Sequence, residues 1–222
     1  MARLPIVPNI EAAPAGSRSR LESIQRQLGT VPNLFRVMAN SPETLEGYFG
    51  LSAALKKGRL PAQTRERIAL AVSEVNGCDY CLSAHTYFGR KLAGLDDAEI
   101  TASRNGMSND MEADAAVRFA VAVAQARGHV SAEEVETVKR AGYDDAQVIE
   151  IIQHVALTTF TNYLNEAVKT EIDFPVVRAR SALDGGAPIT LPAKRLSRSR
   201  RTNPATRSSR TRPTGRPGAH ID

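Results

Sequence analysis

Apolar residues recur three and four positions apart along most of the chain, which is the spacing of one face of an α-helix. The period is clearest at 61–75 and 110–127, and the middle of the second stretch is nearly all apolar. No alternating run of β-branched residues between hairpin turns occurs in the sequence. The pattern therefore predicts an all-α fold.

Start and stop signals divide this pattern into separate helices. Ser41 precedes Pro42, a good start because the hydroxyl accepts from unpaired backbone donors and proline at the first helical position loses no needed bond. Three capping boxes pair a capping side chain with an acid or amide three positions later. They are Asp96/Glu99, Ser131/Glu134 and Asp144/Gln147. The expected helices cover 17–28, a short segment after Pro32, 42–57, 61–75, 79–94, a segment after Asp96, 110–127, a segment after Ser131, and 145–171.

Composition divides the chain into three parts. Residues 1–16 contain three prolines and little apolar pattern, which predicts an extended N-terminal arm. Residues 17–184 carry the helical pattern and form the predicted all-helical domain. Residues 185–222 are rich in Arg, Ser and Pro and have almost no apolar residues. Such a segment cannot offset the entropy of ordering, so a disordered tail is expected.

The basic charge of the chain is concentrated in that tail. The whole sequence has a net charge of +5, yet residues 185–222 alone hold nine Lys or Arg and one acid, which leaves −3 for residues 1–184. The tail can attract phosphate backbones through counterion release. It has no interleaved aromatic residues for base stacking, and the predicted domain is mildly acidic, so a nucleic-acid function is not expected.

Composition also bears on the core and the compartment. Apolar residues make up 42% of the chain, with 5% aromatic and no Trp, so the core should be mostly Ala, Leu, Ile and Val. The amino terminus lacks the unbroken apolar segment of a secretory signal, and no stretch reaches the length of about 18 apolar residues that spans a membrane. We therefore expect a soluble, cytoplasmic protein without a membrane partner.

The two cysteines of the chain, Cys78 and Cys81, are three residues apart, and His85 follows four residues later. On a helix that begins near Gly77, all three side chains lie along one face. A close cysteine pair in a reducing compartment is more often redox-active or metal-binding than structural. Cys78 falls in the first turn, where unpaired N–H groups and the helix dipole favour a thiolate, so the dipole predicts the lower thiol pKa for Cys78.

This spacing suits the reduction of a peroxide. A thiolate that attacks the O–O bond becomes a sulfenic acid, and a second thiol one turn away condenses with it to a disulfide. His85 can take the thiol proton or give one to the leaving oxygen. Glu66 and Glu74 are the candidates for a carboxylate that orients the histidine. Because they are roughly 80° apart around one helix, both are not expected to reach it.

Four other interpretations use the same residues. A c-type haem site needs a histidine directly after the second cysteine, where this chain has Leu82, and a thioredoxin motif should follow a strand. Zinc bound by Cys78, Cys81, His85 and a glutamate has suitable ligands, although paired-cysteine zinc sites usually draw two ligands from a distant segment. The cysteines can also be plain core residues. We predict no metal and no cofactor.

A longer motif surrounds the cysteines. A glutamate lies twelve residues before the first cysteine, Asn-Gly directly precedes it, and the pattern C-x-x-C-x-x-x-H follows. These residues are Glu66, Asn76, Gly77, Cys78, Cys81 and His85. With this motif the chain resembles the AhpD-like alkylhydroperoxidases of the carboxymuconolactone decarboxylase superfamily. The segment 141–167 is similar to the closing helix of that superfamily, so the resemblance covers about residues 20–175.

The resemblance implies a fold, a mechanism and partners. The fold would be an AhpD-like helical bundle with the CxxC at the start of a central helix, in trimeric or hexameric homo-oligomers. Cys81 would be oxidised to sulfenic acid and Cys78 would resolve it, while Glu66 and His85 would form a proton relay. The substrate would be a hydroperoxide, and a dithiol such as a lipoyl protein would be the reductant. The family favours Cys81 as the attacking thiol where the dipole favours Cys78, and the sequence leaves both open.

Further polar residues stand out near the motif and in the closing helix. Tyr80 departs from the best-known members, which have a second histidine between the cysteines, so turnover or choice of reductant could differ. His154 lies among apolar neighbours and is more often a satisfied core residue than a site residue. Asn162 and Tyr163 could line a pocket, but packing and oligomer contacts explain them equally well.

The sequence therefore predicts a peroxide-reducing dithiol oxidoreductase, an alkylhydroperoxidase-type enzyme that cycles Cys78 and Cys81 between dithiol and disulfide. Two alternatives stay open. One is a decarboxylase of the lactone-degrading branch, which does not require a paired thiol. The other is a non-catalytic thiol redox sensor, which would be oxidised stoichiometrically without turnover.

Overall fold

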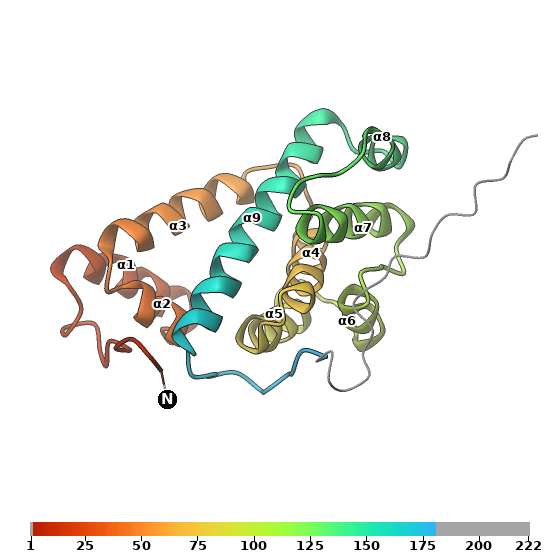
Figure 1. The fold of residues 1–222 in the computed structure, drawn as a ribbon. Helices are drawn as coiled ribbons and strands as arrows, with labels where there is room; N and C mark the ends of the chain where they lie inside the picture. The colour runs from red at the N-terminus through yellow and green to blue at the C-terminus, as the bar shows by residue number, and fades with distance from the viewer. Residues whose placement is uncertain (1, 181–222) are drawn as a thin grey trace, which may run out of the picture. The chain divides into compact units, whose positions relative to one another are not determined.

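The structure is a computed structural model that describes residues 2–180. Within this range the chain forms nine α-helices and no strand, which confirms the predicted all-α class (Figure 1). The helices are α1 (Ala15–Leu28), α2 (Asn33–Met38), α3 (Pro42–Lys56), α4 (Ala62–Val75), α5 (Asp79–Lys91), α6 (Asp97–Arg104), α7 (Met111–Gln125), α8 (Ala132–Arg140) and α9 (Asp145–Val168). The predicted tail at 185–222 lies outside the described residues.

Side-chain caps start several helices where the sequence predicts them. The Ser41 hydroxyl caps α3, with Pro42 at the first helical position. Complete capping boxes start α8 and α9, and their members are Ser131/Glu134 and Asp144/Gln147. Each cap satisfies backbone N–H groups that have no partner inside the helix. These local signals therefore mark the starts of α3, α8 and α9.

Of the two hydrogen bonds in the capping box predicted for α6, one forms and the other does not, so the prediction is half wrong. Asp96 accepts a hydrogen bond from the Glu99 amide at 2.7 Å, as expected. The Glu99 carboxylate does not return the bond, because it pairs with the Arg67 guanidinium at 2.6 Å and accepts from Ser108 and the Asn109 amide. Glu99 therefore ties α4 to the loop after α6 instead of closing a capping box.

Two helix ends also differ from the prediction. α1 begins at Ala15, two residues earlier than expected, with Pro14 in the capping position. α9 ends at Val168 and not near Glu171, because Lys169 adopts a left-handed conformation with a φ of 56°. The chain leaves α9 at that point and continues without helical structure to the end of the described range.

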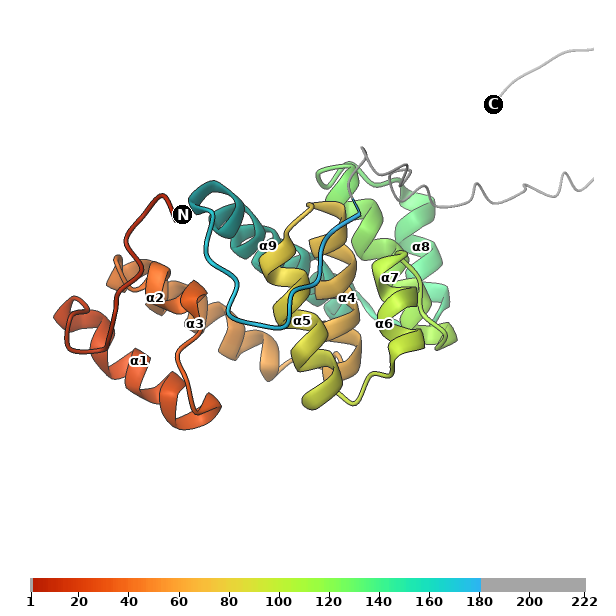
Figure 2. The ribbon, with the colours of Figure 1, turned by 90° about the horizontal axis from the view of Figure 1, so that it is seen from below.

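α4 is the central helix of the fold and packs against α5, α6, α7 and α9 (Figures 1 and 2). Its sequence explains this position, because apolar residues occupy several sides of the helix. The segment 68–72 is at most 5% exposed. Ile68 and Val72 join a core cluster with Phe119 of α7 and Ile151 of α9. Packing on several sides fixes the direction in which each polar side chain of α4 leaves the helix.

A second core cluster joins the N-terminal helices to the start of α5. Leu21 from α1, Leu34 from α2 and Leu45 from α3 belong to it. Cys78 and Cys81 are members of the same cluster. Both thiols therefore lie in the hydrophobic interior and not on the surface of the domain.

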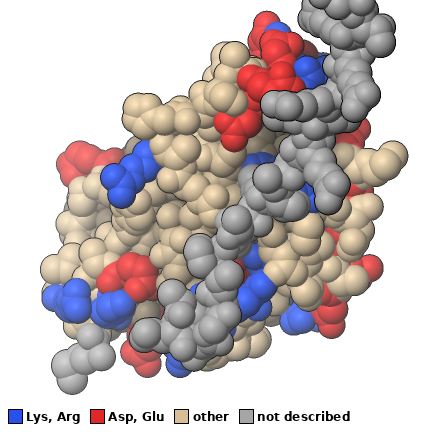
Figure 3. All heavy atoms as spheres, turned by 45° about the vertical axis from the view of Figure 1, so that its right-hand side comes forward, with Lys and Arg blue, Asp and Glu red and all other residues tan. Residues whose placement is uncertain are grey.

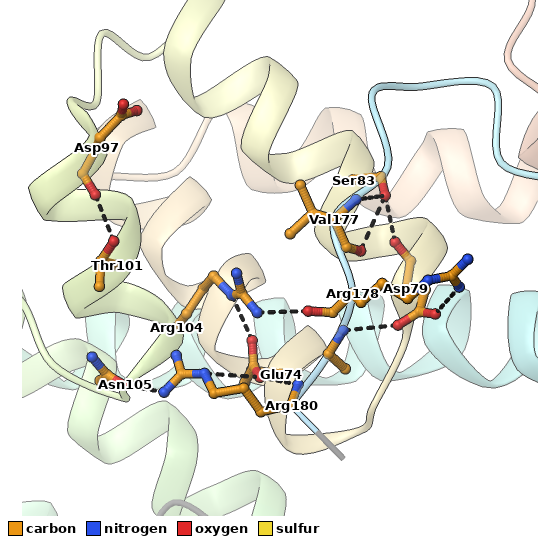
Figure 4. A network of polar contacts seen from close by, with 11 residues as sticks. Glu74, Asp79, Ser83, Asp97, Thr101, Arg104, Asn105, Val177, Arg178 and Arg180 are labelled. Atoms are coloured by element: carbon orange, nitrogen blue, oxygen red, sulfur yellow. Dashed lines mark hydrogen bonds and ion pairs between the residues drawn. The ribbon is translucent and has the colours of Figure 1, made fainter. Parts of the chain in front are cut away.

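Residues 171–180 form an extended segment after α9, which we call the strap (Figure 2). Polar contacts hold the strap against α5 (Figure 4). Ser83 Oγ accepts from the Val177 amide at 2.9 Å, and Asp79 accepts from the Ala179 amide at 2.8 Å. Arg178 adds an ion pair to Asp79 at 2.7 Å. The strap is thus fastened to the first turn and a half of the helix that carries the cysteines.

The surface of the described residues mixes charges of both signs. On the face drawn in Figure 3, acidic and basic side chains are interspersed among uncharged ones. This face therefore does not gather charge of one sign. Within residues 2–180, no helix combines the length and the apolar character needed to cross a membrane.

Candidate functional site

The turn between α4 and α5 positions the two cysteines. α4 ends at Val75, and Gly77 adopts a left-handed φ of 67°, which glycine tolerates without strain. The Cys78 amide then donates to the Ser73 carbonyl at 3.0 Å, which holds the chain against the end of α4. α5 begins at the next residue. This left-handed turn explains why a glycine directly precedes the first cysteine.

The sulfur of Cys78 caps α5. Cys78 Sγ accepts a hydrogen bond from the Cys81 amide at 3.3 Å. Both cysteines are free thiols, and their exposed fractions are 0% and 2%. The two residues lie in one helical turn, as their spacing predicts.

Cys81 has a hydrogen-bond donor of its own from α9. Asn165 Nδ2 donates to Cys81 Sγ at 3.2 Å. A hydrogen bond from the Cys78 thiol, the charge of His85 and the Asn165 amide together lower the pKa of Cys81 to about 6, although burial opposes them. Cys81 is therefore favoured as a thiolate at neutral pH.

The pKa of Cys78 moves in the opposite direction. Its hydrogen bond to Cys81 and its burial raise the pKa of Cys78 well above the usual range. Two adjacent thiols do not ionise together easily, so the pair carries one negative charge, which lies on Cys81. The prediction that the helix dipole gives Cys78 the lower pKa is wrong, because the hydrogen bond from the Cys78 thiol, followed by His85 and Asn165, lowers the pKa of Cys81 and not that of Cys78.

Glu66 of α4 and His85 of α5 form a hydrogen-bonded pair. Glu66 Oε2 lies 2.8 Å from His85 Nδ1, and about a quarter of each side chain is exposed. Burial alone would lower the pKa of His85, but the Glu66 carboxylate and, after it, the charge of Cys81 raise it above the usual value. The structure thus brings together the two groups that the sequence motif singles out.

Glu74, the other candidate carboxylate, does not contact the histidine but forms ion pairs with two arginines. Its side chain is 4% exposed and lies 2.6 Å from Arg104 Nε and 3.5 Å from Arg180 Nε (Figure 4). The Arg180 amide also donates to Glu74 at 2.8 Å. The prediction that both glutamates do not reach His85, made from their rotation of roughly 80°, is confirmed. Glu66 reaches His85, whereas Glu74 reaches the strap.

A cavity of about 350 Å³ opens beside the Glu66 and His85 pair. Its walls come from α1 to α5 and α9 and are largely apolar and aromatic. They include Phe35, Tyr48, Phe49, Phe88 and Leu157. Neither cysteine lines this cavity, which reaches the carboxylate and the imidazole but not the buried sulfurs.

His154 lines the same cavity, and the sequence prediction for it is half right. The residue is buried, at 8% exposed, as a core histidine should be. Its Nε2 atom, however, has no hydrogen-bond partner among residues 2–180, so the expectation of a satisfied histidine is wrong. Burial and then the charge of Arg65 lower the pKa of His154 to about 4, which keeps its ring neutral at pH 7.

The remaining polar residues have different surroundings. The Tyr80 hydroxyl donates to Asp173 of the strap at 2.9 Å and accepts from the Leu34 amide at 3.0 Å, so it fastens strap and α2 to α5. Asn162 is fully buried and Tyr163 is 63% exposed, and neither lines the cavity. Tyr80 is therefore a structural residue at the position where the best-known relatives have a histidine.

Asn165 is the site residue that sequence reasoning does not single out. It follows the buried Asn162 by three residues on the inner face of α9, and it is itself 2% exposed. Two asparagines on the buried face of an apolar helix are an available signal, because buried amides need partners. The sequence alone does not reveal that the partner of Asn165 is a cysteine.

The described residues contain no candidate metal centre. No group of three or more His, Cys, Asp or Glu side chains between residues 2 and 180 is arranged to hold a metal ion. His85 is hydrogen-bonded to Glu66, and Cys81 accepts a hydrogen bond from Asn165. The zinc interpretation therefore has no ligand cluster in this part of the chain.

Comparison with known proteins agrees with the fold and the motif. Residues 42–126 match the model of the Carboxymuconolactone decarboxylase family, a range that contains both cysteines. The structure is similar to that of a peroxidase-related protein from Ralstonia eutropha with an alkylhydroperoxidase AhpD core. The TM-score is 0.70 and the identity 26%, over 78% of this chain and 92% of that one. A peroxidase-related protein from Silicibacter sp. TM1040 gives a TM-score of 0.65 at 25% identity, over 76% and 88%.

The family match over residues 42–126 and the similarity to these two structures support the assignment of the chain as an AhpD-like member of the carboxymuconolactone decarboxylase superfamily. The chain also shares its fold with the debrominase Bmp8, whose complex with 2,3,4-tribromopyrrole gives a TM-score of 0.65 at 21% identity, over 78% of this chain and 94% of that one. Uncharacterized proteins of Haemophilus influenzae and Cupriavidus necator are 49% identical over 45 residues and 34% identical over 70 residues. The chain spans 40% and 57% of the lengths of these two curated relatives.

Proposed function

We propose that the chain is a peroxide-reducing dithiol oxidoreductase of the alkylhydroperoxidase type, in which Cys81 attacks and Cys78 resolves. The observation that carries this proposal is the asymmetry of the buried thiol pair. One sulfur is favoured as a thiolate within the electrostatic reach of His85, whose ring is held by the Glu66 carboxylate. A nucleophilic thiolate, a resolving thiol and an acid–base group are the three elements that peroxide reduction requires.

In the first step, the Cys81 thiolate attacks one oxygen of a hydroperoxide ROOH. The O–O bond breaks, the sulfur is oxidised to sulfenic acid, and the alkoxide leaves. Protonated His85 supplies the proton, so the product is the alcohol ROH. Glu66 supports this step in two ways, because its bond to Nδ1 orients the ring and its charge favours the protonated imidazole.

In the second step, the Cys78 thiol attacks the sulfenic sulfur. An S–S bond forms and water leaves, which protects Cys81 from further oxidation. Both residues belong to one turn of α5, so the disulfide needs only a local change. A dithiol reductant, of the lipoyl type in our proposal, then reduces the disulfide by thiol exchange and leaves as its own disulfide. A reducing compartment such as the cytoplasm would maintain such a reductant.

The cavity supports an organic hydroperoxide as the substrate. Its aromatic and aliphatic walls suit the apolar part of such a molecule, and its polar groups include Glu66 and His85. The peroxide group would face the acid–base pair while the apolar part fills the remaining volume. Because Cys81 does not line the cavity, its attack on the peroxide also requires a local opening between the cavity and the sulfur.

We also propose that the protein works as a homo-oligomer. Ile149, Ile152, Phe160 and Tyr163 of α9 are exposed by 64%, 42%, 40% and 63%. Their spacing places them within about 80° of one another around the helix, so they form one apolar stripe. Exposed apolar patches mark protein contacts. Light scattering of the native protein tests this proposal, and a monomeric mass would contradict it.

The test of the proposed function is a thiol count by mass spectrometry before and after one equivalent of hydroperoxide. We expect an intramolecular disulfide in the wild type, a trapped sulfenic acid at Cys81 in Cys78→Ser, and unreacted Cys78 in Cys81→Ser. Cys78→Ser is suitable because serine keeps an acceptor at the helix cap. Dithiol-dependent loss of peroxide should be abolished in Cys81→Ser, and retained turnover there would overturn the proposal.

Two other results would favour the remaining alternatives. Stoichiometric oxidation of the pair with no turnover in the presence of dithiols would indicate a redox sensor. Activity on a carboxylated lactone that survives removal of both thiols would indicate a decarboxylase of the lactone-degrading branch.

A further inference from the structure

We propose that Asn165 is a further catalytic residue of this site, whose side-chain amide stabilises and orients the Cys81 thiolate from the far helix α9. This proposal rests on the proposed function, because it assumes that Cys81 is the attacking sulfur. It assigns a role to a residue outside the local sequence motif.

The contact is direct and buried. Asn165 Nδ2 donates to Cys81 Sγ at 3.2 Å, and the two residues are each 2% exposed. No bulk water competes with such a bond, so a donor at this position favours the charged sulfur strongly over the thiol. Because Asn165 touches the reacting atom, it acts on the nucleophile itself and not through another residue.

The orientation of the Asn165 amide favours a thiolate, because its N–H group and not its oxygen faces Cys81. Asn165 Oδ1 is buried and has no hydrogen-bond partner among the described residues, although buried amide oxygens almost always have one. The reversed amide would bring oxygen against the sulfur and repel its charge. The observed orientation leaves the oxygen unpaired and gives the N–H group to Cys81. The side chain is therefore arranged for an anion at the sulfur.

A network one turn earlier fixes where α9 meets the cysteine turn. Asn162 Nδ2 donates to Ser73 Oγ at 3.1 Å, and Asn162 Oδ1 accepts from Asn76 Nδ2 at 2.8 Å. The Ser73 carbonyl in turn accepts from the Cys78 amide at 3.0 Å. The same short segment thus holds the cysteine turn and the α9 helix. Asn162 is a positioning residue that sets Asn165 over Cys81, and its own amide lowers the pKa of Cys81 as well, after that of Asn165.

The backbone of Asn165 is also fixed. Its carbonyl accepts from the amides of Lys169 and Thr170, which close the last turn of α9. The left-handed Lys169 ends the helix directly after this turn. The amide therefore projects from a helix end that is held by both its own cap and the Asn162 network.

The test is a titration of the Cys81 thiolate by its ultraviolet absorbance in the Cys78→Ser protein, where Cys81 is the only thiol. This readout does not require a reagent to reach the buried sulfur. In Asn165→Leu, which keeps the size but removes the donor, the pKa of Cys81 should rise by about one to two units.

Two further variants make the test specific. Asn109→Leu changes an exposed asparagine in the loop after α6 and should leave the titration of Cys81 unchanged. Asn162→Ala keeps the Asn165 donor but removes its support and the smaller contribution of the Asn162 amide, so it should raise the pKa of Cys81 by less than Asn165→Leu does. If Asn165→Leu fails to fold, the similarly shaped Asn165→Asp carries the test and should also raise the pKa.

An unchanged pKa of Cys81 in the folded Asn165 variant would overturn the proposal. The titration tests the role of Asn165, and the peroxide assay tests the proposed function, so either can give a negative result without the other. A wild-type protein that has the acidic Cys81 but shows no peroxide turnover would remove the proposed function and leave the role of Asn165 in the thiolate intact. Normal turnover with an unchanged pKa in the variant would keep the function and remove the role of Asn165.

Discussion

Glu66 and Glu74 lie on the same helix, and the two ends of α4 use them for different purposes. Glu66 pairs with an imidazole at 2.8 Å beside a cavity, and about a quarter of its side chain is exposed. Glu74 is 4% exposed and pairs with the guanidinium groups of Arg104 and Arg180. An arginine stays charged at every accessible pH, whereas a histidine gains and loses its proton near neutrality. The partner, and not the carboxylate itself, therefore decides whether an acid on this helix can take part in proton transfer.

The two pairs also hold different parts of the chain. Glu74 joins α4 to α6 through Arg104 and to the strap through Arg180 (Figure 4). Glu66 joins α4 to α5 at the site. Glu74 therefore stabilises the fold, whereas Glu66 takes part in the chemistry that we propose.

The largest effect that separates the two glutamates should appear in activity. In Glu66→Gln the amide can still contact His85 but no longer supplies a negative charge, so His85 loses its preference for the protonated form. We expect hydroperoxide turnover to fall by about a hundredfold, in line with the loss of an acid–base group. Steady-state kinetics with a dithiol reductant measures this fall, and turnover equal to that of the wild type would remove Glu66 from the relay.

The second-largest effect should be a loss of stability in Glu74→Gln. Glu74→Gln leaves two guanidinium groups without their carboxylate, one of them only 20% exposed. We expect the free energy of unfolding to fall by about 2 kcal/mol, below the usual figure for a fully buried pair because both arginines keep some contact with water. Urea denaturation measures it. A loss no larger than that of Glu66→Gln would contradict the contrast between the two ends.

The smallest effect should be a dependence of stability on pH at the Glu66 pair. The pKa of His85 is raised in the folded state, so the pair contributes its full stability below the unfolded pKa of about 6.5. That contribution is lost as the pH rises through the folded pKa of His85. We expect a difference of about 1 kcal/mol or less between wild type and Glu66→Gln that shrinks over this interval. A difference that stays constant with pH would show that the pair does not titrate in this way.

The sequence predicts those features that depend on nearby residues. Helix starts at Ser41 and Asp144 follow from side chains within three positions of the start. The placement of Cys78, Cys81 and His85 on one helix follows from its period alone. The rotation of the two candidate glutamates around α4 predicts that both do not reach His85, but it does not predict which of them does.

The remaining features depend on contacts between distant parts of the chain. Asn165 and Cys81 are 84 positions apart, and Asp79 and Ala179 are 100 positions apart. Whether such residues meet is set by the angle and register at which helices pack, which the apolar period does not specify. Glu99 illustrates the same limit, because a long-range arginine and a loop outcompete the local capping box that its spacing predicts.

Six helices in the described range begin with a side-chain cap, and the acceptor is an oxygen of Ser or Asp in five of them and the sulfur of Cys78 in α5. Sulfur is a weaker acceptor than a hydroxyl or carboxylate oxygen, so cysteine is a poor choice for starting a helix. Stability and reactivity therefore make opposite demands on this one position. A search for more stable variants of this chain would favour serine at position 78, and it would remove one of the two thiols in the same step.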